Sequence, residues 1–228
     1  MRKFHLIWVG ILLAGCGQFP NPNDISAINP ESRVEIANKR LEAAQETLQY
    51  KVSSREINDE RRNELISEIA EEMLKSIEPQ VIPDSDQWMY AALLRVTNRW
   101  PEAEKALEVA VSAAKTEDRR INDTLKLAVA QAKNQKTIEA ISTASKVLDA
   151  KDEDAAPILP SVLYEVVPAA QGKGHDKELM ILLEKAIECH KRVKVDPKTD
   201  QGKLFIAASR HHIGIAETKV IELAGTQI

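Results

Sequence analysis

Apolar side chains recur along this chain at steps of three and four residues, and the pattern returns at a nearly constant interval. Its copies begin at Ile66, Ala103, Ala140 and Leu179, which are 37, 37 and 39 residues apart, and the copy at Ile66 is the faintest. The residues that follow at helical steps are Ala70, Met73, Leu107, Ala110, Ala144, Val147, Leu183 and Ala186. Such steps place side chains on one helix face, and a period in the thirties is typical of stacked helical hairpins. The repeat therefore predicts an all-α fold, an α-solenoid of helical hairpins.

Prolines and polar stretches divide the chain into segments. Residues 31–78 are expected to form an N-terminal helical hairpin or one long helix, and Ser53-Ser54-Arg55-Glu56 favours two helices because it resembles a capping box. Pro79 and Pro83 then interrupt the chain. Residues 84–228 are expected to form the repeat domain, and no segment has a convincing strand pattern.

The unit at residues 84–114 is the best example of the repeat. Ala91 and Leu94 lie on its first helix, and Ala103, Leu107 and Ala110 lie on its second. This alternation of small and large residues resembles the tetratricopeptide repeat, and the resemblance extends over roughly residues 57–193.

The resemblance has clear departures. The family's usual Trp, Gly and Tyr on the first helix are Gln87, Ala91 and Leu94 here, and its closing Pro is Lys115. Another type of helical-hairpin solenoid and a closed helical bundle therefore remain as alternatives, because any amphipathic helix contains alanines and leucines at such steps.

The first fifteen residues have the layout of a secretory signal peptide. Arg2 and Lys3 precede an apolar run, Phe4–Leu13, which is well short of the ~20 residues that span a bilayer. The sequence Leu13-Ala14-Gly15-Cys16 that ends this segment resembles the lipobox of bacterial lipoproteins. That resemblance implies a signal peptide over residues 1–15, cleavage before Cys16, and acyl chains such as palmitate on the cysteine.

The residues after the cysteine suggest a tether and a location. Residues 16–30 are expected to comprise the lipidated Cys16 and a flexible tether, because they are rich in Pro, Asn and Gly and lack helical periodicity. Gly17, where an aspartate often marks inner-membrane retention, favours the periplasmic face of an outer membrane if the organism has one. The chain is thus expected to be lipid-anchored in the cell envelope, with its folded domain outside the cytoplasm.

Composition narrows the possible functions. The formal net charge of −4 becomes more negative once Arg2 and Lys3 are removed, so nucleic acid is not an expected partner. Only 4% of the residues are aromatic and eight are glycine, which argues against a β-sandwich or a glycine-rich nucleotide site. His211 and His212 are adjacent and point about 100° apart on a helix, so they cannot share one metal. No catalytic motif, metal site or cofactor is predicted, and we do not expect an enzyme.

One group of residues is a candidate for partner binding. If the first helix of each unit lines a concave groove, as the tetratricopeptide resemblance implies, Trp88, Ala92 and Arg95 lie on that face. The other candidate partner-binding residues are Asn122, Tyr164 and Gln171. An exposed aromatic beside an arginine is typical of a binding hot spot. The simpler interpretation is that Trp88 and Tyr164 pack between neighbouring helices.

These features predict a membrane-tethered interaction scaffold of the cell envelope. Its partners would be an envelope protein or peptide, and the lipid bilayer through acylated Cys16. The alternative is an envelope binding protein for a small ligand or polymer, held in the concavity of the solenoid.

Overall fold

The structure is a computed structural model that describes residues 24–225 and contains no strand within that range. Its helical elements are α1 (Pro30–Ser53), α2 (Asp59–Leu74), η1 (Pro79–Val81), η2 (Asp84–Asp86), α3 (Gln87–Val96), α4 (Trp100–Ala113), α5 (Glu117–Lys133), α6 (Thr137–Ser145), α7 (Ile158–Ser161), η3 (Val162–Val166), α8 (Val167–Ala170), α9 (Asp176–Lys191) and α10 (Asp200–Gly225). The predicted all-α class is confirmed. The predicted signal peptide and Cys16 lie outside the described residues.

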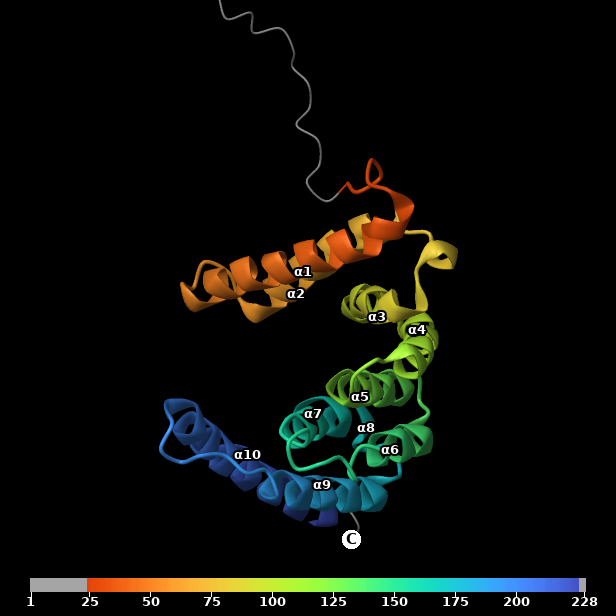
Figure 1. The fold of residues 1–228 in the computed structure, drawn as a ribbon. Helices are drawn as coiled ribbons and strands as arrows, with labels where there is room; N and C mark the ends of the chain where they lie inside the picture. The colour runs from red at the N-terminus through yellow and green to blue at the C-terminus, as the bar shows by residue number, and fades with distance from the viewer. Residues whose placement is uncertain (1–23, 226–228) are drawn as a thin grey trace, which may run out of the picture.

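The helices follow one another through space in nearly the same order as in the sequence. α3 packs on α4, α4 on α5 and α5 on α6, while α1 packs on α2 and α3, and α9 packs on α10. In Figure 1, α3, α5 and α7 lie on one side of the stack and α4 and α6 on the other. The α1–α2 hairpin and α10 extend beyond α3, α5 and α7 on the same side, at opposite ends.

The residues of the repeat lie in the interior. Ile66 is 8% exposed, while Ala103, Ala140 and Leu179 are fully buried, and they belong to α2, α4, α6 and α9. The residues that follow them at helical steps are buried too: Ala70, Met73, Leu107, Ala110, Ala144, Val147, Leu183 and Ala186. The alanines among them let each of these helices approach its neighbours closely.

Three of the turns between helices have the same backbone geometry. Arg55, Asn98 and Gln135 have φ angles of 61°, 58° and 65°, in the left-handed region that usually requires glycine. In each turn the next residue donates its N–H to a carbonyl five residues back: Glu56 to Lys51, Arg99 to Leu94 and Lys136 to Gln131. This is the Schellman ending of a helix, and it reverses the chain after α1, α3 and α5.

The boundary between α1 and α2 differs from the prediction in detail. The chain does form two helices here, but Ser53 ends α1 and does not cap α2. The cap of α2 is Asn58, whose side chain accepts a hydrogen bond from the Arg61 N–H at 2.8 Å. Ser54 bonds to Glu56 within the turn at 2.7 Å, so the capping-box residues hold the turn together.

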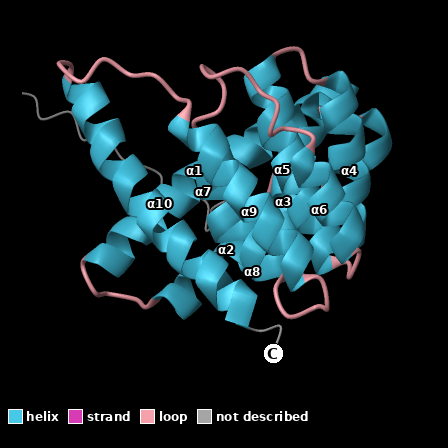
Figure 2. Cartoon of the chain, turned by 90° about the horizontal axis from the view of Figure 1, so that it is seen from below, coloured by secondary structure: helices cyan, strands magenta, loops and turns pink. Residues whose placement is uncertain are grey.

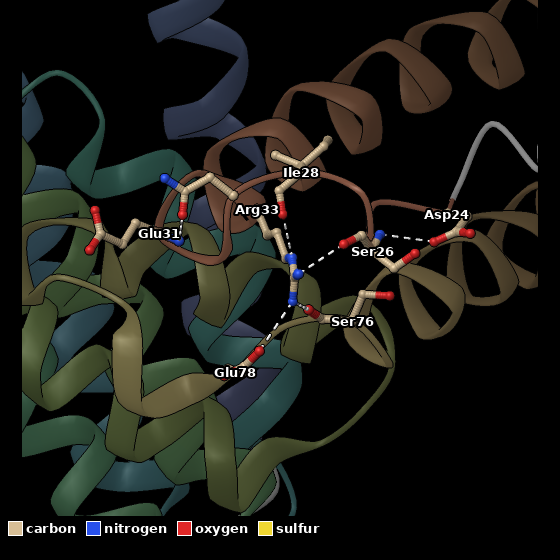
Figure 3. A network of polar contacts seen from close by, with 8 residues as sticks. Asp24, Ser26, Ile28, Glu31, Arg33, Ser76 and Glu78 are labelled. Carbon is tan, nitrogen blue, oxygen red and sulfur yellow. Dashed lines mark hydrogen bonds and ion pairs between the residues drawn. The ribbon is translucent and has the colours of Figure 1, made fainter.

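The tether predicted for residues 16–30 is too long at its C-terminal end. Ile25 is fully buried, and Arg33 on α1 donates to the carbonyl oxygens of Ser26 and Ile28, each at 2.8 Å. Figure 3 shows the same guanidinium reaching the Ser76 carbonyl at 2.8 Å and Glu78 at 3.2 Å. Composition alone suggested a flexible segment here, but one isoleucine and one arginine hold it against α1 and the end of α2.

The interior consists of two clusters of buried apolar side chains that meet at α5. Leu127 and Ala130 of α5 belong to the cluster built by α1 to α4, whereas Leu125 and Ala128 belong to the cluster built by α5 to α10. Trp100 packs against both clusters. The α5 helix therefore joins the two halves of the chain into one body.

Residues 158–170 form a continuous helical stretch with a widened turn at its centre. The Val167 N–H bonds to the Val162 carbonyl, five residues back, which makes η3 a π-helical turn. Pro168 has no N–H to donate to Tyr164, so the ordinary α-helical bond cannot form there. The widened turn carries Glu165, which lies close to α3 and α5.

Candidate functional site

A cavity of about 360 Å³ lies between α1, α3, α4 and α5. Two tryptophans, Trp88 and Trp100, lie in its wall with Leu41 and Leu107. The polar residues around it are Asn38, Glu42, Gln45, Arg95, Arg119, Asn122, Asp123 and Lys126. A hollow with apolar walls and several convergent polar groups is the usual form of a binding site.

Trp88 is held in this wall by a cation. The Cζ atom of Arg119 lies 3.6 Å from the centre of the Trp88 ring, which is close contact for a cation–π interaction. Arg119 also approaches Asp123 at 3.5 Å, one helical turn further along α5. The aromatic ring, the guanidinium and the carboxylate therefore form one unit that joins α3 to α5.

Asp123 is the most deeply buried carboxylate in the cavity wall. Its side chain is only 3% exposed, and its Oδ2 atom accepts no hydrogen bond from any described residue. Burial raises the pKa of Asp123, although Arg119 and Lys126 oppose that shift. An unsatisfied buried acceptor is costly and is suited to a donor supplied from elsewhere.

Arg95 on α3 is tied to the widened turn of η3. Its Nη2 atom lies 2.9 Å from Glu165, and Lys126 of α5 bonds both oxygens of the same carboxylate at 2.6 and 2.8 Å. Burial lowers the pKa of Arg95, while Glu165 opposes this change. The Arg95 Nε–H is buried and has no acceptor among the described residues. Arg95 and Lys126 both line the cavity, and Arg95 retains an unused donor.

A larger and more open hollow, of about 1290 Å³, lies next to the cavity along α1 and α2. The two share Gln45 and Val96. Its remaining lining is strongly polar and includes Gln49, Arg62 and Glu64. Together the two hollows follow α1 from the tryptophan pair toward the exposed end of the first hairpin.

The structure brings three of the five candidate binding residues together. Trp88, Arg95 and Asn122 all line the smaller cavity, together with Ala92. Trp88, Ala92 and Arg95 are partly exposed, whereas Ala91 and Leu94 on the other side of α3 are fully buried. The register predicted for α3 therefore agrees with the structure, while a role in binding remains a prediction.

The other two candidates lie elsewhere. Tyr164 is 47% exposed, and its ring meets the His212 ring of α10 edge to face at 5.6 Å. Gln171 is the residue that ends α8, and it does not line the cavity. The widened turn before it shifts the helix register, so a regular helical projection from residue 158 does not apply to either residue.

Sequence reasoning missed Arg119, Asp123 and Glu165. The first two lie near the start of α5, which begins at Glu117 and is rich in charged side chains there, so neither stood out as a site residue. Thr116, whose side chain accepts from the Arg119 N–H, was the available signal for that start. Glu165 is 70 residues from Arg95, and no sequence pattern links the two residues.

His190 and Cys189 pack within the last hairpin. Cys189 and His190 of α9 are 3% and 2% exposed, and the His190 ring lies 5.4 Å from that of Phe205 on α10. Between Asp24 and Gly225, no three His, Cys, Asp or Glu side chains gather in a geometry that could hold a metal ion. None of the helices in this range is both long and apolar enough to cross a membrane.

No protein-family model, curated protein or solved structure matches this chain.

Proposed function

We propose that this chain is a lipid-anchored scaffold of the cell envelope, and that the cavity between α1, α3 and α5 receives a segment of a protein partner. The anchor is supported by the order of basic residues, apolar run and lipobox that ends at Cys16. The repeat domain is, in this proposal, a tetratricopeptide-like solenoid. The recurring turns at Arg55, Asn98 and Gln135 support it, as does the burial of the repeat residues.

The observation that carries the binding site is the gathering of Trp88, Arg95 and Asn122 around one cavity. Tryptophan and arginine contribute most of the energy in many protein interfaces, especially when the surrounding residues exclude water. The unused Arg95 Nε–H and Asp123 Oδ2 offer one donor and one acceptor. A peptide backbone presents both complementary groups in each residue, so an inserted segment carries the kinds of group that these atoms lack.

Filling the cavity tests this proposal without removing any of its contacts. Ala92 lies in the wall and is partly exposed, so Ala92→Phe places a ring in the space that a partner would occupy. Ala43→Phe, on an exposed part of α1, is the matched control. Partners are captured from cross-linked cells and identified by mass spectrometry.

The proposal expects Ala92→Phe to keep the wild-type melting temperature and lose a partner that Ala43→Phe retains. Truncating a hot spot typically costs 2 kcal/mol or more, which is roughly a thirtyfold loss of affinity, and blocking it should cost at least as much. An unchanged partner list from a folded Ala92→Phe protein would show that the binding face lies elsewhere.

A small-ligand binding protein is the second candidate. The cavity volume of about 360 Å³ is at the lower end of the range for small-molecule sites, and both unsatisfied atoms suit a polar ligand. Native mass spectrometry of the purified full chain distinguishes the two functions. A bound small molecule that Ala92→Phe displaces would favour the second.

A further inference from the structure

The last helix presents a long uncharged face that nothing in the described chain covers. Six residues of α10 lie on this face at steps of three and four, and all are exposed: Leu204, Ala207, His211, Gly214, Thr218 and Ile221. Leu204 and Ile221, at its two ends, are each 72% exposed. The opposite side of α10, which includes Ala216 and Leu223, is buried against the rest of the molecule. Figure 1 shows α10 at the far end of the stack from α1, and Figure 2 looks at the molecule from that end.

We propose that two copies of this chain pair through this face of α10, with the two helices antiparallel. The six residues follow a seven-residue repeat of the kind that forms helix-to-helix seams. In an antiparallel pair one register aligns all of them: Leu204 faces Ile221 of the second copy, Ala207 faces Thr218, and His211 faces Gly214. The large side chains then meet at both ends, and the small ones meet at the centre, where the helices approach most closely.

Charges beside the seam are complementary in the same register. Arg210 and Glu217 are exposed, lie seven residues apart on one flank of the face, and form no ion pair within residues 24–225. Antiparallel pairing places Arg210 of each copy beside Glu217 of the other, so two-fold symmetry gives two intermolecular ion pairs. Parallel pairing would instead set these charges against the opposite flank of the other copy, so Arg210 would not meet Glu217. On the other flank the two central positions, Ala208 and Ile215, are apolar and would face each other across the two copies.

This self-complementarity is the reason for assigning the face to a second copy. An unrelated helical partner would not require the sign of the charge to reverse between Arg210 and Glu217. A lipid surface would not require a glutamate on this flank. The inference is independent of the cavity between α1, α3 and α5, since α10 contributes no residue to it.

Disulfide trapping in cells tests the register directly. The full chain is expressed as two differently tagged copies, one carrying Leu204→Cys and the other Ile221→Cys. These positions are 17 residues apart on one helix, roughly 25 Å, so no bond can form within a copy. A disulfide-linked dimer containing both tags is expected. Unsubstituted copies, which retain Cys16 and Cys189, report the background.

The matched control carries Leu204→Cys in both copies. The antiparallel register keeps these two cysteines roughly 25 Å apart, so this pair should give only the background signal. Linkage of Leu204→Cys to itself would show parallel pairing, and a mixed pair that gives only background would show no pairing. Either result would overturn the proposal.

Charge reversal gives a second measurement on the purified full chain. Arg210→Glu sets glutamate against Glu217 at both symmetry-related contacts beside the seam, and sedimentation should show a dimer about tenfold weaker. Adding Glu217→Arg in the same chain should restore the wild-type dissociation constant. If Arg210→Glu leaves association unchanged while the circular dichroism spectrum is also unchanged, Arg210 does not lie at an interface between copies.

Discussion

The Nζ atom of Lys136 lies 2.9 Å from the Oε1 atom of Glu104, and together these residues fasten the turn between α5 and α6 to α4. The Glu104 side chain is only 7% exposed, and Asn134 Nδ2 donates to its other oxygen at 2.6 Å. Three consecutive helices thus share one buried carboxylate, whose two oxygens are both satisfied.

Replacing Glu104 with alanine should destabilise the protein. The variant loses both hydrogen bonds and the packing of the side-chain stem, and we expect the free energy of unfolding to fall by about 1–3 kcal/mol. Urea unfolding followed by circular dichroism measures the change. Glu188→Ala removes a solvent-exposed ion pair with Lys191 and should have little effect. Equal effects of the two substitutions would contradict the structural role of Glu104.

An acidic residue at Ala103 should be among the most harmful single substitutions. Ala103 is fully buried on α4, so Ala103→Asp places an unpaired carboxylate between packed helices, at a cost of about 3 kcal/mol or more. Val109→Asp on the same helix is the control, because Val109 is 37% exposed. Thermal melting should separate the two clearly, and an unchanged melt for Ala103→Asp would refute the packing of α4.

Stability should fall as the pH drops through the mildly acidic range, because of His190. Burial lowers the pKa of His190 below its ordinary value of 6.5, and the neighbouring His212 adds to this effect, while a backbone contact at Ala156 opposes it. In this pH range His190 therefore binds a proton more readily in the unfolded chain than in the folded chain. The stabilisation is fully present above pH 6.5 and is lost as the pH falls toward the folded-state pKa.

Urea midpoints at pH 7 and pH 5 measure this dependence. His190→Phe should reduce it, because a phenyl ring fills similar space beside Phe205 and cannot be protonated. His211→Gln, at an exposed position, should retain the wild-type dependence. If His190→Phe loses as much stability between the two pH values as the wild type, another group is responsible.

Asp123 should have the opposite pH dependence. Its folded-state pKa is raised above the ordinary 3.8, so the folded chain holds a proton more tightly than the unfolded chain does. The resulting stabilisation is present below pH 3.8 and is lost as the pH rises through the folded-state pKa. Asp123→Asn should therefore raise the urea midpoint at pH 7, and this gain should shrink as the pH approaches 3.8.

Lipid attachment at Cys16 is tested by metabolic labelling with a clickable palmitate. The wild-type chain should be labelled, and Cys16→Ser should lose the label and accumulate as a precursor. Cys189→Ser, which removes the other cysteine, should remain labelled. Equal labelling of the wild type and Cys16→Ser would remove the basis for the membrane anchor.

Periodicity in the sequence was enough to predict the helices that bury one face. The steps at Ala103, Ala140 and Leu179 require a helix with one apolar side, whatever the partner helix is, so local pattern and tertiary burial agree. The α3 register followed from the same argument, because placing Ala91 and Leu94 inside leaves Trp88 and Arg95 on the other side.

The features that escaped prediction depend on backbone conformations that composition does not reveal. Arg55, Asn98 and Gln135 occupy turn positions where glycine would have been the signal. The π-helical turn at Val162–Val166 brings Glu165 to Arg95 and Lys126 across the fold. Ile25 is a further example. It is buried although its neighbours in the sequence are rich in Pro and Asn, and Arg33 holds the nearby Ser26 and Ile28 carbonyls.

The contacts around Arg33 also determine how the protein would respond to mechanical force. A pull on the chain at Asp24 loads the Arg40 bond to the Asp24 carbonyl and the Arg33 bonds to the Ser26 and Ile28 carbonyls. Because the Arg33 guanidinium also holds the Ser76 carbonyl at the end of α2, the load passes to both helices of the first hairpin at once. Tension applied at the amino-terminal side would therefore shear several bonds together, and α1 would not peel away one turn at a time.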